Sequence, residues 1–243
     1  MANEFQIDSL LPADMAAKAE QIGVKKVHLN SVSMFALAIL AGAFIALGAI
    51  FATTVSAGSM PTSAADGTAA FSTGLPYGVT RLLAGLAFGL GLILVIVGGA
   101  ELFTGNNLIV MAWANRKVST KLLLKNWVIV YCGNFVGAIA TAVLMYFTAQ
   151  YKFGNGAIGL FVKAGAPESF WTSIHKTAAE FANLTWDKFL INNLLPVTIG
   201  NIIGGALMVG VVYWFIYLRH QHPAVAAKIA LKNEATAEPV SHK

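Results

Sequence analysis

Long apolar runs separated by more polar stretches dominate this chain. A bilayer core is about 30 Å thick and takes about 20 helical residues to cross. Residues 1–30 and 219–243, which flank these runs, are polar and mixed in charge. The pattern predicts an all-α, polytopic membrane helical bundle, organised as one membrane domain over residues 1–243. Its predicted membrane segments are residues 34–55, 82–114, 126–148 and 189–218.

The second run, between Arg81 and Lys117, is too long for one straight crossing and too short for two. One helix would measure roughly 50 Å at about 1.5 Å per residue, whereas two antiparallel spans need about 40 residues and a turn. The polar stretch GGAELFTGNN (98–107) interrupts the run. We therefore predict one span in two helical pieces, with this stretch as a non-helical, re-entrant break. Such a break needs protein or a water-filled cavity to cover its backbone groups, and it often faces a substrate path.

Five residues of this stretch are candidates for shaping the break. The glycines permit a turn because they lack a Cβ atom. Glu101 is the only acidic residue in any of the predicted spans, and an intramembrane carboxylate is a functional candidate by default. Because a negative charge would hinder an anion, we predict that this carboxylate caps a half-helix and holds the loop. The five candidates are Gly98, Gly99, Glu101, Gly105 and Asn106.

Composition supports a membrane protein and narrows its chemistry. Hydrophobic residues make up 57% of the 243 and charged residues 11%, and the mean hydropathy is +0.68. The net charge of +5 comes largely from loops and tails, so nucleic acid is a poor partner. The single Cys132 excludes a disulfide framework. No metal-ligand cluster, nucleophile–base pair or phosphate-binding loop stands out, so a membrane enzyme is the weakest interpretation and we predict no cofactor.

Basic residues predict the orientation of the four crossings. They precede the first span, separate the second from the third, and follow the last, while the other two loops are poorer in them. The positive-inside rule then puts both termini in the cytoplasm. Pro12 predicts the start of an N-terminal helix, which we expect to end near Gln21 because Gly23 follows. We expect this helix to rest on the membrane domain or a neighbouring subunit; the alternative is a moving cap over a pore mouth.

Spans three and four share a pattern. Each contains Asn, six residues, Gly-Asn, two residues and Gly, at 126–137 and at 193–204. Such a match predicts an internally duplicated transporter or channel. The first half supplies a plain span, a broken span and a Gly-Asn span, whereas the second supplies only the last of these. We therefore predict that on the order of 60 residues are missing between Leu160 and Phe161.

Nearly the whole chain carries, in order, the four segments LLPADMA, GGAELFTGN, KNWVIVYCGNFVGA and LLPVTIGNIIGGALMVG. They resemble the formate–nitrite transporter family, and within it the bacterial formate channels. The resemblance implies an aquaporin-like architecture of two inverted repeats with six spans, assembled into a homopentamer with one pore per protomer. The family's second broken span, with its Gly-Phe-Glu-His-Ser-like run and pore histidine, has no match here. The second repeat is therefore incomplete.

The resemblance also assigns residues to a pore. Thr104 matches the pore-facing threonine and Asn201 the pore asparagine, while Phe88, Leu92 and Leu102 match hydrophobic constrictions. Each has a plainer interpretation: a threonine bonded to its own helix, an interhelical amide bond, and ordinary packing. Asn134, the repeat mate of Asn201, is predicted to be structural.

We therefore expect a channel or transporter for formate, passive or proton-linked, in the bacterial inner membrane. Nitrite or hydrosulfide poses similar demands on a pore and is an alternative substrate. A rival from another class is a non-conducting, shortened scaffold protein that keeps the oligomer surfaces of the family but lacks a complete pore.

Overall fold

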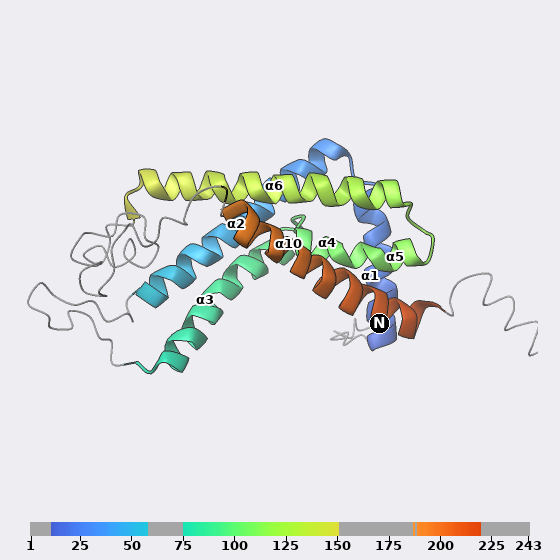
Figure 1. Ribbon diagram of the computed structural model, residues 1–243, viewed down its shortest axis with the longest axis horizontal. Helices are drawn as coiled ribbons and strands as arrows, with labels where there is room; N and C mark the ends of the chain where they lie inside the picture. The colour runs from blue at the N-terminus through green and yellow to red at the C-terminus, as the bar shows by residue number, and fades with distance from the viewer. Residues whose placement is uncertain (1–10, 58–74, 151–186, 188, 220–243) are drawn as a thin grey trace, which may run out of the picture. The chain divides into compact units, whose positions relative to one another are not determined.

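The computed structural model describes residues 11–57, 75–150, 187 and 189–219. All the regular elements of this described part are helices (Figure 1). In chain order they are α1 (Pro12–Val27), α2 (Ser31–Ala57), α3 (Tyr77–Val97), α4 (Phe103–Asn106), η1 (Asn107–Ile109), α5 (Val110–Ala114), α6 (Thr120–Phe147), η4 (Phe189–Leu194), α10 (Leu195–Asn201), η5 (Ile202–Val211) and η6 (Trp214–Leu218).

Four helical stretches of the described residues are long and apolar enough to cross a membrane: Ser31–Ala57, Gly78–Val97, Thr120–Phe147 and Phe189–Leu218. Each overlaps one predicted segment. The predicted segment 82–114 is divided as expected, because α3 ends at Val97 and α4, η1 and α5 follow after a short break. The chain is thus a helical, multi-pass membrane protein with a broken span.

These helices form two compact units, which we describe separately. The α2–α3 unit comprises Asn30–Phe103 and Val128–Val197. The α1–α5 unit comprises Met1–Leu29, Thr104–Trp127 and Thr198–Lys243.

In the α2–α3 unit, α2 and α3 run side by side because glycines lie on both sides of the contact (Figure 1). A Cβ atom added to Gly48 would lie 2.8 Å from the carbonyl oxygen of Phe88. One added to Gly91 would lie 2.7 Å from that of Phe44. Interfaces between membrane helices favour such small residues, since they let the two backbones approach.

Glycines also bring α6 against α2. A Cβ on Gly137 would collide with the carbonyl oxygen of Ile39, and one on Gly42 with the backbone of Asn134. Small residues of the first membrane helix therefore permit close packing at this contact.

In the α1–α5 unit, α1 packs against η1, α5 and η6. Two apolar clusters hold it: Val27 lies with Ile109 and Ala112, and Ala16 lies with Met111 and Leu218. The prediction that α1 ends near Gln21 is wrong.

The helix passes through Gly23 and reaches Val27. Gly23 is buried, and a Cβ there would lie 3.3 Å from the Cα of Ile109. This glycine therefore serves a close contact instead of ending the helix.

The last membrane helix is unusual because η4, η5 and η6 are π-helical, with α-helical turns between them. π-helical turns are normally single bulges and often mark functional sites. Two glycines of η5 lie against η1 and α5. A Cβ on Gly205 would lie 3.0 Å from the Cβ of Asn107, and one on Gly210 would collide with Val110.

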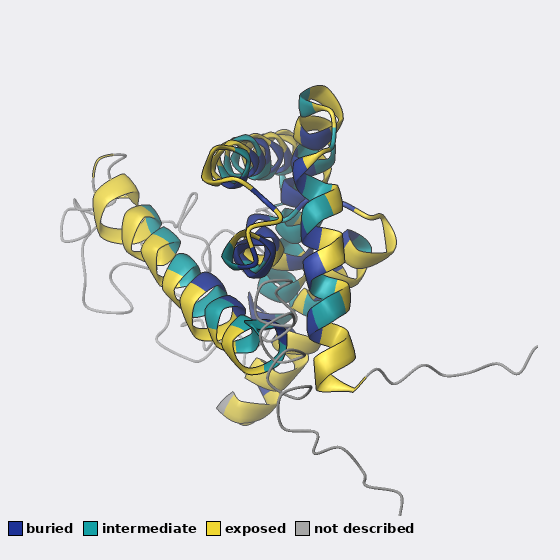
Figure 2. Cartoon of the chain, turned by 90° about the vertical axis from the view of Figure 1, so that its right-hand side faces the viewer, coloured by how far each residue is buried: buried dark blue, intermediate teal, exposed yellow. Residues whose placement is uncertain are grey.

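Most apolar side chains outside these contacts are exposed. Figure 2 shows the buried residues as short stretches along helices that are otherwise exposed or half-buried. On α3, Leu86 is 68%, Ile96 71% and Val97 82% exposed. In a membrane protein such surfaces face lipid or other protein.

The α2–α6 contact makes a testable prediction. We expect Gly137→Ala to lower the free energy of unfolding by about 1–3 kcal/mol, the usual cost of overpacking, because the new methyl group would collide with Ile39. Gly89→Ala is the matched control, since a Cβ at Gly89 meets no atom within 4 Å. Unfolding in detergent, followed by circular dichroism, measures both. Equal stability of the two variants would contradict the contact.

Candidate functional site

The break begins with a tight helix end at the C-terminus of α3. The N–H of Gly99 donates to the carbonyl of Ile96 at 3.2 Å, and the N–H of Ala100 donates to that of Val95 at 3.0 Å. This pair of bonds is a Schellman motif, which needs a left-handed residue at its turn. Gly99 supplies it with φ +59°. Two glycines at this point therefore stop the helix, as predicted.

One side chain, that of Asn134 on α6, binds the end of the break and the first residue of α4. Its Nδ2 donates to the carbonyl of Glu101 and to that of Ala38, both at 2.8 Å. Its Oδ1 accepts from the N–H of Phe103, the first residue of α4, at 2.9 Å. The N–H of Glu101 donates to the carbonyl of Leu37 at 3.2 Å. The break is thus bonded to two neighbouring helices, and the prediction that Asn134 is structural is confirmed.

The break is shorter than predicted. It covers residues 98–102, so Gly105 and Asn106 do not belong to it but to α4. Because the Asn134 side chain already accepts a bond from the first N–H of α4, the helix can restart at Phe103. Glu101 is buried, at 4% exposed. The capping role of its carboxylate stays a prediction.

Buried amides also surround α4 and η1 in the α1–α5 unit. The Asn106 Oδ1 accepts from Lys26 Nζ at 3.0 Å, and its Nδ2 donates to Asn126 Oδ1 at 2.9 Å. The backbone carbonyl of Asn106 accepts from Trp127 Nε1 at 3.0 Å. The second piece of the broken span is therefore bonded to α1 and to the start of α6. Sequence reasoning missed this network; the only signal for it was the repeated asparagine at position 126.

A second polar cluster in this unit joins three distant segments. The buried carboxylate of Glu20 on α1 accepts bonds from Asn115 Nδ2 and, at 2.6 Å, from Lys117 Nζ. The Asn115 Oδ1 accepts from Trp214 Nε1, also at 2.6 Å. The cluster connects α1, the turn after α5 and η6. It explains why a buried acid on α1 is tolerated, since buried charges need partners.

The predicted pore residues fall in both units. Thr104 lies in the α1–α5 unit, where it is exposed. Within the described part of the chain its hydroxyl makes no hydrogen bond. By contrast, Thr54 and Thr141 donate to carbonyls four residues earlier in their own helices, at 2.9 Å each. The plainer interpretation of Thr104, a hydroxyl bonded to its own helix, is therefore not what the structure has.

Asn201, in the same unit, is half-buried at the end of α10. Its backbone carbonyl accepts from Asn107 Nδ2 at 3.0 Å. The Asn107 Oδ1 is buried and has no partner among the residues that the structure describes.

The three apolar candidates lie in the α2–α3 unit. Phe88 and Leu92 on α3 are 42% and 47% exposed. Leu102 is half-buried beside the cluster of Ala41, Val95 and Ala100. None of the three is a fully buried core residue, which is compatible with a wall facing a lumen, lipid or other protein.

Membrane-crossing helices together with a broken span, and buried amides at the break, define a multi-pass membrane protein of the channel and transporter type. A sequence profile described as Formate/nitrite transporter matches residues 13–178 and 157–215. The chain belongs to this family, and the predicted family and fold class are confirmed.

Individual relatives support the assignment to this family. The chain is 34% identical to the formate channel FocA of Escherichia coli K12, over 90% of this chain and 98% of that one. It is 28% identical to FocA of Haemophilus influenzae, over 90% and 100%. A solved structure, described as a pentameric formate channel with formate bound, is similar at 32% identity, with a TM-score of 0.63, over 78% of this chain and 98% of that chain.

The comparisons also bear on the incomplete repeat. The alignment with the E. coli channel extends over 293 positions, more than the 243 residues of this chain, so at least 50 positions there have no counterpart here. The two profile matches overlap at 157–178, and this overlap contains the predicted junction between Leu160 and Phe161. The prediction of an internally shortened second half is thus confirmed. The junction itself lies outside the described residues.

Asn134 offers a test of how the break is held. We expect Asn134→Leu to lower the free energy of unfolding by about 2–4 kcal/mol, because it leaves buried backbone groups without partners, each costing about 1–3 kcal/mol. Asn193→Leu is the control, since Asn193 is an exposed asparagine in the last membrane helix. Thermal unfolding of the purified variants in detergent measures the difference. A stable Asn134→Leu protein would show that other groups hold the break.

Proposed function

We propose that this chain is a channel or transporter for formate, or a similar small monovalent anion, in the bacterial inner membrane. It forms one membrane domain over residues 1–243, with both termini in the cytoplasm, and assembles into a homopentamer. Its family membership and its two relatives named formate channels support the substrate. The solved relative, which is a pentamer with formate bound, supports the assembly. Nothing in the proposal requires catalysis.

The observation that carries this proposal is the hydroxyl of Thr104. An anion that enters the membrane loses hydration, and an unpaired charge in hydrocarbon costs many kcal/mol. A hydroxyl can rotate to donate to an anion without trapping it as a fixed cation would. Thr104 lies in α4, just after the break, where it is exposed and makes no hydrogen bond within the described residues. Its hydroxyl is therefore available to a passing anion.

The other pore candidates complete the proposed path. The amide of Asn201 provides a second donor. The exposed apolar side chains of Phe88 and Leu92, together with Leu102, narrow the path and strip water from the ion. Glu101 is buried in the break, where its backbone is bonded on both sides. We assign its carboxylate to capping and not to the path. Nitrite or hydrosulfide would accept hydrogen bonds from the same donors. Competition between these anions in the flux assay measures the selectivity.

Formate flux into proteoliposomes tests the role of Thr104. We expect Thr104→Val to reduce flux about tenfold or more, because a hydrogen bond to a charged group is worth about 1.5–3 kcal/mol. Thr54→Val is the matched control, since the Thr54 hydroxyl bonds its own helix backbone. The flux of this control should stay within about twofold of the parent. Equal flux in the Thr104 variant and the parent would exclude the threonine from the path.

A second candidate function, a non-conducting scaffold, is favoured by the shortened second half. In the first half, Gly133 and Gly137 of the repeated pattern lie against α2. Their repeat mates, Gly200 and Gly204, meet no described atom within 4 Å of an added Cβ. The helix that would pack there, the counterpart of α2, belongs to the missing part of the repeat. One wall of a path would then depend on lipid or another protein.

Restoring the repeat separates the two functions. We expect formate flux from the chain as it stands if the four spans suffice, and background flux if it is a scaffold. A version with two spans inserted between Leu160 and Phe161 should conduct in either case. The Thr104→Val comparison is repeated in that version, so that the role of the threonine is measured even if the shorter chain does not conduct formate. Background flux from the chain as it stands, with flux from the restored version, would contradict the channel proposal and favour the scaffold; background flux from both versions would contradict a role for either in anion transport.

A further inference from the structure

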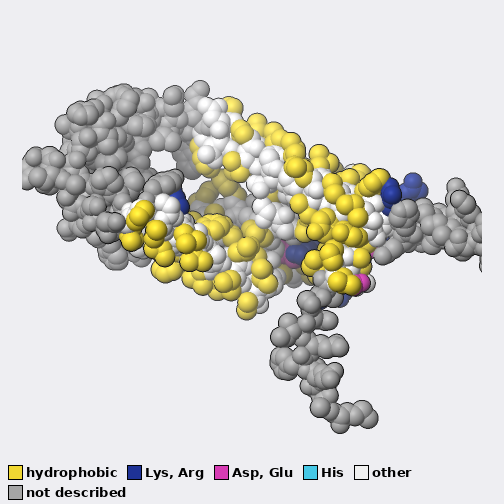
Figure 3. All heavy atoms as spheres, turned by 90° about the horizontal axis from the view of Figure 1, so that it is seen from below, with side chains coloured by type: hydrophobic (Ala, Val, Ile, Leu, Met, Phe, Trp, Pro, Cys, Tyr) yellow, Lys and Arg dark blue, Asp and Glu magenta, His cyan; other side chains and the backbone are white. Residues whose placement is uncertain are grey.

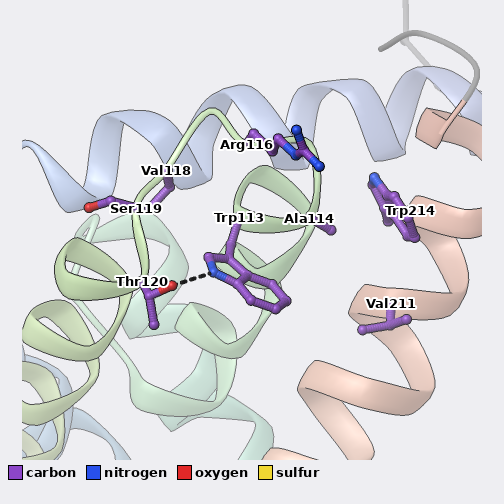
Figure 4. A pocket seen from close by; sticks show the side chains of 8 residues that line it. All are labelled: Trp113, Ala114, Arg116, Val118, Ser119, Thr120, Val211 and Trp214. Atoms are coloured by element: carbon purple, nitrogen blue, oxygen red, sulfur yellow. Dashed lines mark hydrogen bonds between the residues drawn. The ribbon is translucent and has the colours of Figure 1, made fainter. Parts of the chain in front are cut away.

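A groove of about 670 Å³ opens beside the turn that follows α5, and none of the residues assigned to the anion path lines it (Figure 4). It lies wholly within the α1–α5 unit. Its lining combines two indole rings, a guanidinium, two hydroxyls and small apolar side chains. The residues that matter here are Trp113, Arg116, Ser119, Thr120, Val211 and Trp214.

The backbone at Arg116 is unusual. The N–H of Arg116 donates to the carbonyl of Trp113 at 2.8 Å, and that of Lys117 donates to Ala112 at 2.9 Å. This is the same helix-ending motif that uses Gly99 at the end of α3, and Arg116 adopts the same φ of +59°. Glycine is the usual residue at this position. A bulky side chain held in a strained backbone conformation points to a function for that side chain.

The charge of Arg116 is not neutralised by its neighbours. Its side chain is exposed and forms no ion pair or hydrogen bond within the described part of the chain. Lys117, the next residue, is paired with Glu20 at 2.6 Å. The groove therefore has an available guanidinium at its edge, and Figure 4 shows this side chain extending toward Trp214.

The aromatic walls are fixed in place. Trp113 Nε1 donates to Thr120 Oγ1 at 3.0 Å, and Trp214 Nε1 donates to Asn115 Oδ1 at 2.6 Å. Both indole N–H groups are thus occupied, and the rings present apolar surface (Figure 4). Ser119 Oγ accepts from the N–H of Leu122 at 3.3 Å, so its own proton remains able to donate. Figure 4 shows this hydroxyl pointing away from both rings, whereas the Arg116 guanidinium lies on the side of Trp214 and suits an anionic oxygen beside an apolar body.

The place of the groove in the chain indicates the ligand. It lies where one membrane span ends and the next begins, and tryptophan prefers the membrane–water interface. After Val211, the last helix continues with exposed apolar residues: Val212 is 44%, Phe215 52% and Ile216 53% exposed. Figure 3 shows hydrophobic side chains spread over much of the described surface on the face it draws, with Lys and Arg in small groups. A ligand with an anionic head and hydrocarbon tails fits this combination.

We propose that the groove binds the headgroup of an anionic phospholipid. Arg116 pairs with the phosphate. The glycerol and upper acyl chains lie along Trp113, Val211 and the apolar surface of the last helix. Basic pockets between membrane helices bind such headgroups in other proteins. Free phosphate would use the guanidinium but none of the apolar walls.

Native mass spectrometry of the full chain, with phosphatidylglycerol and phosphatidylcholine in competition, tests this site. We expect Arg116→Gly to weaken phosphatidylglycerol binding about fivefold, the effect of about 1 kcal/mol for one basic residue near an anionic surface. The variant keeps the left-handed turn, so it should melt at the same temperature or higher. Val211→Trp, which fills the groove without changing charge, should weaken binding as well.

Lys121→Gln is the matched control, because Lys121 is exposed near the groove but does not line it. Its binding should stay within about twofold of the parent. The proposal is overturned by unchanged binding in Arg116→Gly or Val211→Trp. Equal losses in Lys121→Gln and Arg116→Gly overturn it too, since they indicate diffuse charge attraction. Displacement of the lipid by inorganic phosphate at equal concentration also overturns it, because the apolar walls would then contribute nothing.

Discussion

The structure depends on the rule that backbone polar groups inside a bilayer need partners within the protein. A straight helix meets the rule by itself, but a broken one exposes N–H and C=O groups at each end of the break. Here the backbone bonds of Gly99 and Ala100 close the end of α3. The side-chain amide of Asn134 meets the need where the helix restarts, since it donates to Glu101 and accepts from Phe103. An amide suits this task because it donates and accepts at once. One residue of α6 thus permits a polar notch in an otherwise apolar span.

The same constraint explains why the neighbouring helices approach so closely. Asn134 also donates to Ala38 on α2, and the glycines on either side of it, Gly133 and Gly137, bring the two backbones together. A larger residue at either position would push α2 and α6 apart and lengthen the bonds of the asparagine. Close packing and hydrogen bonding at the break are therefore one feature, encoded by the Gly-Asn-x-x-Gly pattern of the sequence.

Run lengths and composition predicted the spans, and the mismatch between run length and membrane thickness predicted the break. These properties are local, so they can be predicted from the sequence. The point where the helix restarts depends on Asn134, 31 residues after Phe103. Likewise Gly23 was mistaken for a helix end because its partner, Ile109, is far away in the chain. The left-handed Arg116 was missed because nothing in its sequence suggests a glycine-like backbone. At the site, the position of Thr104 after the break was predictable, whereas its unpaired hydroxyl was visible only in the described part of the structure.

The repeated Gly-Asn pattern makes different contacts in the two halves of the chain. In the first half its glycines lie against α2, and its asparagine holds the break. In the second half Gly200 and Gly204 have no such neighbour among the described residues, and the helix instead packs through Gly205 and Gly210, in a π-helical stretch, against η1 and α5. These contacts of the last helix are therefore made with the first half and not with a broken span of its own. An ion path needs walls that exclude lipid on every side, so the side facing Gly200 and Gly204 decides between a conducting and a silent protein.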